Sequence, residues 1–100
     1  MIVCITAQGS SLDSEVDPRF GRCSYFIFYD TDTKQHEAVE NQWKAAMGGA
    51  GIQAAQFVVQ KGAKKVFTGR IGPNAEEVLK NAGVEIVEVS GKVKDIISKL

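Results

Sequence analysis

The sequence predicts one α/β domain built on a mixed five-stranded sheet. Three observations indicate this fold class. The chain opens on an apolar run, its second half alternates apolar runs with helical patterns, and two glycine-rich turns stand where a strand gives way to a helix. Because 100 residues are one domain's worth of chain, residues 1–100 are expected to form a single domain.

Three strands are expected in the first half of the chain. Residues 2–7 are typical of a strand that is buried on both faces. Residues 25–29 are aromatic and β-branched, and residues 36–41 alternate polar and apolar as an edge strand with one wet face does. A short turn joins the last two strands into a hairpin, so the second strand is expected to run antiparallel to all the others.

The second half predicts strand–helix–strand units. Helices are expected over residues 50–61 and from Pro73 to Ala82, each ended by a glycine. Buried strands are expected over residues 65–68 and 84–89, parallel to the first strand through right-handed crossovers. A C-terminal amphipathic helix completes the order β-β-β-α-β-α-β-α, and its apolar positions recur at i, i+3, i+4 and i+7: Val93, Ile96, Ile97 and Leu100.

Composition excludes several classes of function. Twelve basic and twelve acidic residues cancel, whereas nucleic-acid binders and polybasic membrane-surface proteins usually carry a basic excess. No apolar run approaches the roughly 20 residues of a membrane-spanning helix. The first residues lack the charged region of a signal peptide, and two cysteines fit a reducing compartment, so a cytoplasmic location is expected.

Three loops are expected to meet at the carboxyl ends of the parallel strands, where open α/β sheets bind ligands. They cover residues 8–21, 42–51 and 69–74 and include Arg19 and Arg70, and the second strand begins at the same edge, which brings the third arginine, Arg22, there as well. Glycine-rich helix starts expose backbone N–H groups, which favours an anionic ligand. Simple tight turns and chance placement of the arginines are the alternatives. The candidate binding residues are Ser10, Arg19, Arg22, Gly48, Gly49, Ala50, Gly51, Gly69, Arg70, Gly72 and Asn74.

Cys23 is the candidate metal ligand. It is expected at the same edge of the sheet, near arginines that favour its thiolate, and a thiolate suits iron, copper or molybdenum–sulfur species. The alternative is a small buried apolar residue. Cys4 lies mid-strand and is expected in the core, with no disulfide between the two cysteines.

Other side chains have weaker functional interpretations. The acidic group Asp13, Glu15 and Asp17 could bind a hard cation, but a solvated loop is the simpler expectation. Met47 could offer a thioether or pack, and Trp43 is expected to cover an apolar edge. The sequence offers no paired carboxylates on its first strand, no histidine beside a nucleophile and no Walker-type motif, so an enzyme is not expected.

Three motifs together resemble the dinitrogenase iron–molybdenum cofactor biosynthesis family, which includes nitrogenase cofactor carriers and orange protein-like members. They read DPRFGR (residues 17–22), GGAGIQAA (48–55) and TGRIGPNA (68–75). The resemblance implies a ribonuclease H-like three-layer fold. It also implies a role in carrying or inserting the iron–molybdenum cofactor or its precursor, or in holding a molybdenum–copper sulfide cluster without covalent attachment.

The residues and the resemblance together predict a small non-catalytic carrier for an anionic metal–sulfur cofactor. The expected cargo is an iron–molybdenum–sulfur or molybdenum–copper–sulfur cluster, with none in the isolated protein as the alternative. Residues 42–47 hold no histidine or cysteine, which favours electrostatic and N–H···S capture over ligation. The alternatives are a protein–protein adaptor in cofactor delivery, a small-anion-binding module without metal, and an enzyme acting on a small phosphorylated or carboxylated molecule.

Overall fold

Five strands form one mixed sheet in the order β3-β2-β1-β4-β5. In the computed structural model, which describes residues 1–100, β2 pairs antiparallel with β1 and β3, whereas β4 is parallel to β1 and β5. The expected antiparallel second strand is therefore confirmed. The strands are β1 (Ile2–Ala7), β2 (Tyr25–Asp30), β3 (His36–Glu40), β4 (Ala63–Thr68) and β5 (Glu85–Glu88).

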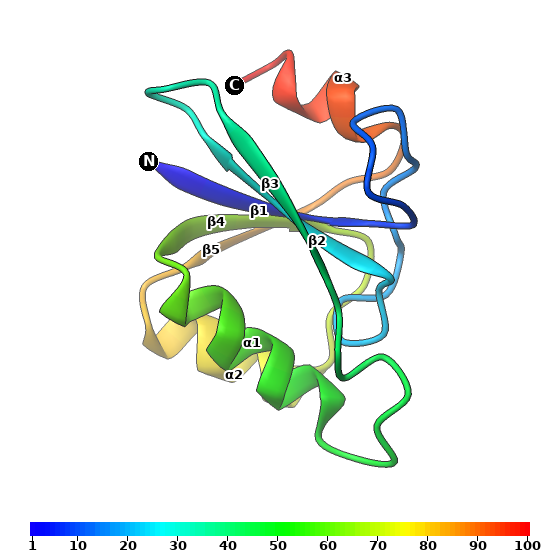
Figure 1. Ribbon diagram of the computed structural model, residues 1–100. Helices are drawn as coiled ribbons and strands as arrows, with labels where there is room; N and C mark the ends of the chain where they lie inside the picture. The colour runs from blue at the N-terminus through cyan, green and yellow to red at the C-terminus, as the bar shows by residue number, and fades with distance from the viewer.

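Helices cover both faces of this sheet (Figure 1). Helices α1 (Ala50–Gln60) and α2 (Pro73–Asn81) lie on one face, and the short α3 (Val93–Ile97) lies on the other. The α/β class and the mixed five-stranded sheet with helices are confirmed, and the elements follow in the expected chain order. The narrower ribonuclease H-like classification stays a prediction. The longest helix has 11 residues, and none has the length and apolar content needed to cross a bilayer.

Two apolar cores lie on the two faces of the central strand β1, which is buried from Val3 to Ala7. The core under α1 and α2 contains several aromatic rings, and the ring centroids of Phe26 and Phe57 lie 5.6 Å apart. The core under α3 is mainly aliphatic and includes Val93. Each buried side chain of this size contributes about 1.5–3 kcal/mol, so this double burial fixes the sheet and hence the edge where its loops meet.

The C-terminal helix is shorter than its apolar spacing predicts. Val93 and Ile96 are buried as expected, but α3 ends at Ile97 and Leu100 is exposed. The last residues continue in tighter i to i+3 turns, in which Leu100 N–H donates to the Ile97 carbonyl at 3.0 Å. The α-helix ends before Leu100, which is exposed, so its expected packing on the inner face was wrong.

Candidate functional site

Close glycine contacts bring the three expected loops together at one edge of the sheet. A Cβ atom on Gly21 would lie 2.7 Å from the Cα of Gly51, and one on Gly69 would lie 2.5 Å from the Cα of Pro18. The Arg70 N–H donates to the Pro18 carbonyl at 2.6 Å, which sets the first loop alongside the loop after β4. These glycines are needed because two backbones pass where a side chain would collide.

A hollow of about 280 Å³ lies between the first turns of α1 and α2. Neither helix has a side-chain cap, and their first intrahelical bonds start only at Gln53 and Glu76. Residues 50–52 of α1 and residues 74 and 75 of α2 therefore have N–H groups without an acceptor in their own helix, whereas the first residue of α2, Pro73, has no N–H. Both helix dipoles point at this place. The hollow is lined by Phe20, Gly21, Gly49, Gly51, Ile52, Gly72, Pro73, Asn74 and Ala75.

Two glycines beside this hollow have no structural need to be glycine. A Cβ atom on Gly48 or Gly72 would meet nothing within 4 Å, and neither residue has a positive φ. Gly72, the N-cap of α2, is extended with φ −74° and ψ 161°, a conformation that any residue adopts. By contrast, Gly49 has φ 73°, which favours glycine on backbone grounds alone.

The structure brings part of the predicted set to the hollow. Gly49, Gly51, Gly72 and Asn74 line it. Ala50 is buried. Sequence reasoning missed Phe20, Gly21, Ile52, Pro73 and Ala75 as lining residues, although every one of them lies in or beside a quoted motif.

The arginines do not line this hollow, which corrects the expected single arginine-lined pocket. The Arg19 Nε lies 3.3 Å from the Asp17 Oδ1, and Arg22 Nη1 donates to the carbonyls of Lys44 and Ala46. Arg70 lines a separate hollow on the α3 side of the sheet. Where each guanidinium lies depends on the acceptors and open surface around it. That a residue belongs to a loop does not predict this.

Ser10 lies in a different part of the first loop, away from the glycine-lined hollow. The flanking residues bond to the segment that begins α3, where Val93 N–H donates to Ser14 O at 3.0 Å and Lys94 N–H to Leu12 O at 2.8 Å. Ser10 itself is exposed. The first loop is thus divided, and only its second half, which holds Phe20 and Gly21, reaches the hollow.

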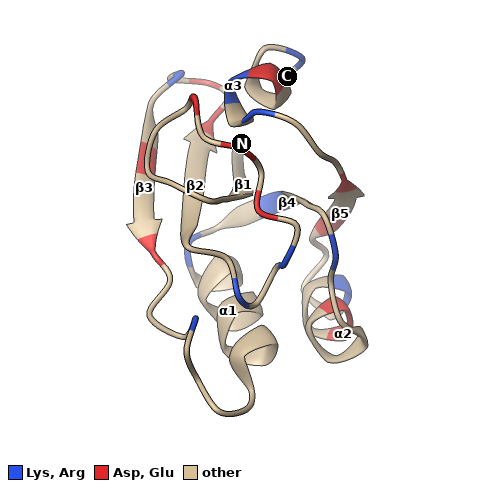
Figure 2. Ribbon diagram, turned by 90° about the vertical axis from the view of Figure 1, so that its right-hand side faces the viewer, with Lys and Arg blue, Asp and Glu red and all other residues tan.

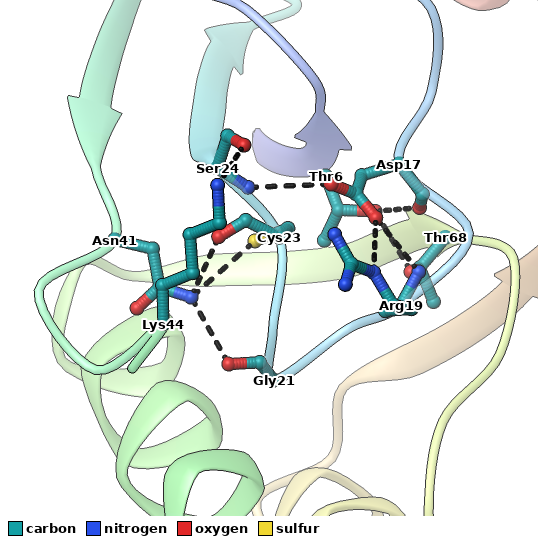
Figure 3. A network of polar contacts seen from close by, with 9 residues as sticks. All are labelled: Thr6, Asp17, Arg19, Gly21, Cys23, Ser24, Asn41, Lys44 and Thr68. Atoms are coloured by element: carbon teal, nitrogen blue, oxygen red, sulfur yellow. Dashed lines mark hydrogen bonds and ion pairs between the residues drawn. The ribbon is translucent and has the colours of Figure 1, made fainter. Parts of the chain in front are cut away.

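A buried carboxylate organises that second half of the first loop (Figure 3). Asp17 is 1% exposed, and its Oδ1 accepts from the Arg19 N–H at 3.0 Å while its Oδ2 accepts from the Ser24 N–H at 3.3 Å. The Thr6 hydroxyl donates to the Asp17 carbonyl at 2.9 Å and lies 2.7 Å from the Thr68 hydroxyl. The expected solvated or cation-binding role for Asp17 was wrong, because backbone donors already occupy both of its oxygens.

Asn41 ties the same segment to the loop before α1 (Figure 3). Its Nδ2 donates to the Gly21 carbonyl at 3.0 Å and the Cys23 carbonyl at 2.9 Å, and its Oδ1 accepts from the Trp43 N–H at 2.9 Å. The Trp43 ring packs at an angle against Phe57, with ring centroids 5.5 Å apart, which confirms that it covers an apolar edge. Met47, in contrast, packs on nothing and is fully exposed.

Cys23 belongs to the core and not to an accessible edge. Its side chain has no exposed surface, and Asn41 Nδ2 lies 3.7 Å from its Sγ. Burial, reinforced by the nearby charge of Asp17, raises the pKa of the Cys23 thiol to about 12. The expected arginine-stabilised thiolate was therefore wrong, because the small effect of Arg19 is outweighed by desolvation. Both cysteines are free, which confirms the expected lack of a disulfide.

The raised pKa of Cys23 predicts a loss of stability in alkali. Below pH 9 the thiol is protonated in both folded and unfolded chains, whereas between 9 and about 12 only the unfolded chain ionises. The unfolded state then binds fewer protons, so the free energy of unfolding falls by about 1.4 kcal/mol per pH unit from this group. Urea denaturation across this range is expected to show a shallower fall for Cys23→Ala, and identical slopes would contradict the assignment.

No group of three or more histidine, cysteine, aspartate or glutamate side chains is placed to hold a metal ion. The site is thus a hollow of backbone N–H donors at two helix starts, in a small α/β domain. A metal-containing group bound here would accept hydrogen bonds from the backbone N–H groups through its own acceptor atoms.

Comparisons with known proteins identify the family of this chain. The family described as dinitrogenase iron–molybdenum cofactor matches residues 1–100, and the chain belongs to that family. Apo orange protein from Desulfovibrio gigas has a similar solved structure, with 37% identity, a TM-score of 0.93 and coverage of 98% of this chain and 84% of that one.

Two further relatives extend this similarity. The solution structure of a candidate NifB protein from Thermotoga is 39% identical, with a TM-score of 0.85 and coverage of 97% of this chain and 84% of that one. An uncharacterized protein of Methanocaldococcus jannaschii is 28% identical over 91 residues, which are 88% of this chain and 77% of that protein.

Proposed function

We propose that this protein is a small, non-catalytic carrier for an anionic metal–sulfur cofactor, held in the hollow between the starts of α1 and α2. The observation that carries the proposal is Gly72, which lines the hollow although the fold does not require a glycine there. Gly48, which precedes the lining residue Gly49, is likewise not required to be glycine. A glycine that meets no neighbour and needs no positive φ leaves backbone N–H groups open to a bulky ligand. Family membership supports a cofactor of the iron–molybdenum–sulfur class, and the molybdenum–copper–sulfur class is the other candidate.

The proposed mechanism is capture without a metal–protein bond. The free N–H groups of the two first helical turns donate to sulfide or oxygen atoms of the cargo, and the helix dipoles offset its negative charge. The guanidinium of Arg19 remains 58% exposed beside its ion pair and adds positive potential from the neighbouring loop. Cys23 is left out of this mechanism because its thiol is buried and protonated.

This mode of binding suits transfer of the cargo. The hollow of about 280 Å³ is lined by glycines, one asparagine and apolar residues, and it would hold a cluster through several weak hydrogen bonds. The cargo can then leave without breaking a covalent ligand bond. We therefore propose a partner protein that delivers or receives the cofactor, and a reducing, cytoplasmic setting consistent with two free thiols.

The sharpest test is Gly72→Ser. The extended backbone of Gly72 is that of a normal N-cap, so a serine hydroxyl there is expected to accept from the α2 amides that the cargo uses. The variant should be more stable by a few tenths of a kcal/mol, on the order of a serine-for-glycine N-cap exchange, yet bind cargo more weakly. Anaerobic reconstitution with iron or copper, molybdate and sulfide, followed by visible absorption and metal analysis, measures the binding.

Gly83→Ala is the matched control for that experiment. Gly83 ends α2 with φ 78°, so the change is expected to lower stability by about 1 kcal/mol while leaving cargo binding unchanged. Equal loss of cargo in both variants would show that the effect is not specific to the α2 amides and would contradict the proposed site. No uptake by the unchanged protein would favour a small-anion module without metal.

An adaptor that docks a partner through Trp43 is less well supported. Trp43 is held against Phe57 and is only partly exposed. The remaining support for an adaptor is the open edge of β3. A partner that binds equally well to Gly72→Ser would fit that alternative.

A further inference from the structure

Arg70 differs from the other two arginines because no acceptor within the chain holds its guanidinium. Arg19 pairs with Asp17, and Arg22 donates to two loop carbonyls. Arg70 uses only its backbone, which bonds to the first loop. Its exposed side chain borders a hollow of about 630 Å³, distinct from the glycine-lined one.

This second hollow lies where β4 and β5 end, on the side of the sheet that α3 covers. Its residues come from the first loop, the loop after β4, the end of β5 and the chain just beyond it, the helix α3 and the residues that follow α3. In open α/β sheets the carboxyl ends of parallel strands are the usual place for ligands. The hollow is lined by Pro18, Gly69, Arg70, Glu88, Val89, Ser90, Ile96 and Lys99.

Two cations at this hollow are unpaired. Acidic and basic residues are mixed over most of the molecule (Figure 2), and six ion pairs join many of them. Neither Arg70 nor Lys99 takes part in any of these pairs. Glu88 is the one acidic residue of the lining, so the hollow carries an excess of positive charge.

The remaining lining residues indicate which other groups a ligand of this hollow would carry. Ile96 is buried and Val89 is half-buried, which gives the hollow an apolar wall. Ser90 and Glu88 offer hydrogen-bonding groups that suit a hydroxyl of the ligand. The volume falls within the range of small-molecule sites, about 300–1,000 Å³, and far exceeds the size of an inorganic anion.

We propose that this hollow binds a small organic acid, with its carboxylate or phosphate group on Arg70 and Lys99 and its carbon body against Val89 and Ile96. The forked guanidinium is suited to two-oxygen recognition of either group. The site is separate from the glycine-lined hollow, so the proposal goes beyond the carrier function and does not depend on it.

The test uses succinate and glycerol 3-phosphate as probes, with inorganic phosphate as the comparison, in ¹H–¹⁵N NMR titrations of the whole chain. One of the two organic probes is expected to shift the amides of Gly69 and Ser90 in a saturable way, more tightly than inorganic phosphate. Arg70→Ala is expected to weaken that affinity about tenfold or more, since a charge-assisted hydrogen bond is lost. Glu88→Gln is expected to strengthen it by removing a repulsive charge.

Lys64→Ala is the matched control, because Lys64 is exposed and forms no ion pair but lies at the opposite end of β4. Lys64→Ala should leave the affinity for the probe unchanged. A loss of affinity equal to that of Arg70→Ala would show that only the net charge matters and would overturn the proposal. The proposal would also be overturned if neither organic probe gave a saturable shift, or if inorganic phosphate bound as tightly as the organic probes. Gly72→Ser is expected to bind the probes normally, which separates this test from that of the carrier function.

Discussion

Asp17→Ala is expected to lower the free energy of unfolding by about 3 kcal/mol, because hydrogen bonds to a buried charged group are worth roughly 1.5–3 kcal/mol each. The change leaves the N–H groups of Arg19 and Ser24 without the acceptors they have in the folded protein. The side chain is 1% exposed, so water cannot readily replace the lost carboxylate. Urea denaturation followed by circular dichroism measures the loss.

Asp13→Ala is the control for that experiment. Asp13 lies in the same loop and pairs with Lys94 at 3.0 Å, but it is 73% exposed and its removal should change stability little. The lowered pKa of Asp13, caused mainly by its hydrogen bond with Lys94, reflects this exposed pair only. Similar losses in the two variants would contradict the organising role assigned to Asp17.

Gly21→Ala is expected to disturb the site most directly. The added methyl group would lie 2.7 Å from the Cα and 2.8 Å from the nitrogen of Gly51, and both atoms are backbone, so the first loop or the start of α1 must move. Such overpacking costs about 1–3 kcal/mol. Amide chemical shifts in the first turn of α1, together with the urea midpoint, report the change.

Gly48→Ala provides the contrast, because its methyl group would enter open space and its φ is not positive. It should keep the fold and the amide shifts of α1 beyond its own neighbours. If Gly21→Ala behaved in the same way, the close approach of the two loops would not be what fixes the hollow.

Two kinds of glycine therefore meet at this edge of the sheet. Gly21 and Gly69 allow backbones to pass each other and hold the loops in place. Gly48 and Gly72 have room for a side chain. The first pair is therefore needed for the fold, whereas the second pair is explained by the proposed function. The sequence shows only that all four are glycine.

The sequence by itself determined the sheet, the order of its elements and the two helix starts that face one hollow. These follow from local patterns: apolar runs for buried strands, glycine and proline at helix ends, and chain order for parallel crossovers. The three sequence motifs also predicted the family, and the family is confirmed.

Only the tertiary structure decided which side chains share that hollow. Arg19 pairs with Asp17, Arg22 donates to loop carbonyls, and Arg70 borders a separate hollow. Asp17 is buried and accepts from the backbone of Ser24, and Cys23 lies in the core with a raised pKa. Each outcome depends on how loops distant in sequence dock, and a residue two positions along a loop can face the opposite way. Within strands and helices, the periodicity of the sequence predicts which way each side chain points. In loops, the direction of a side chain depends on contacts with the rest of the fold.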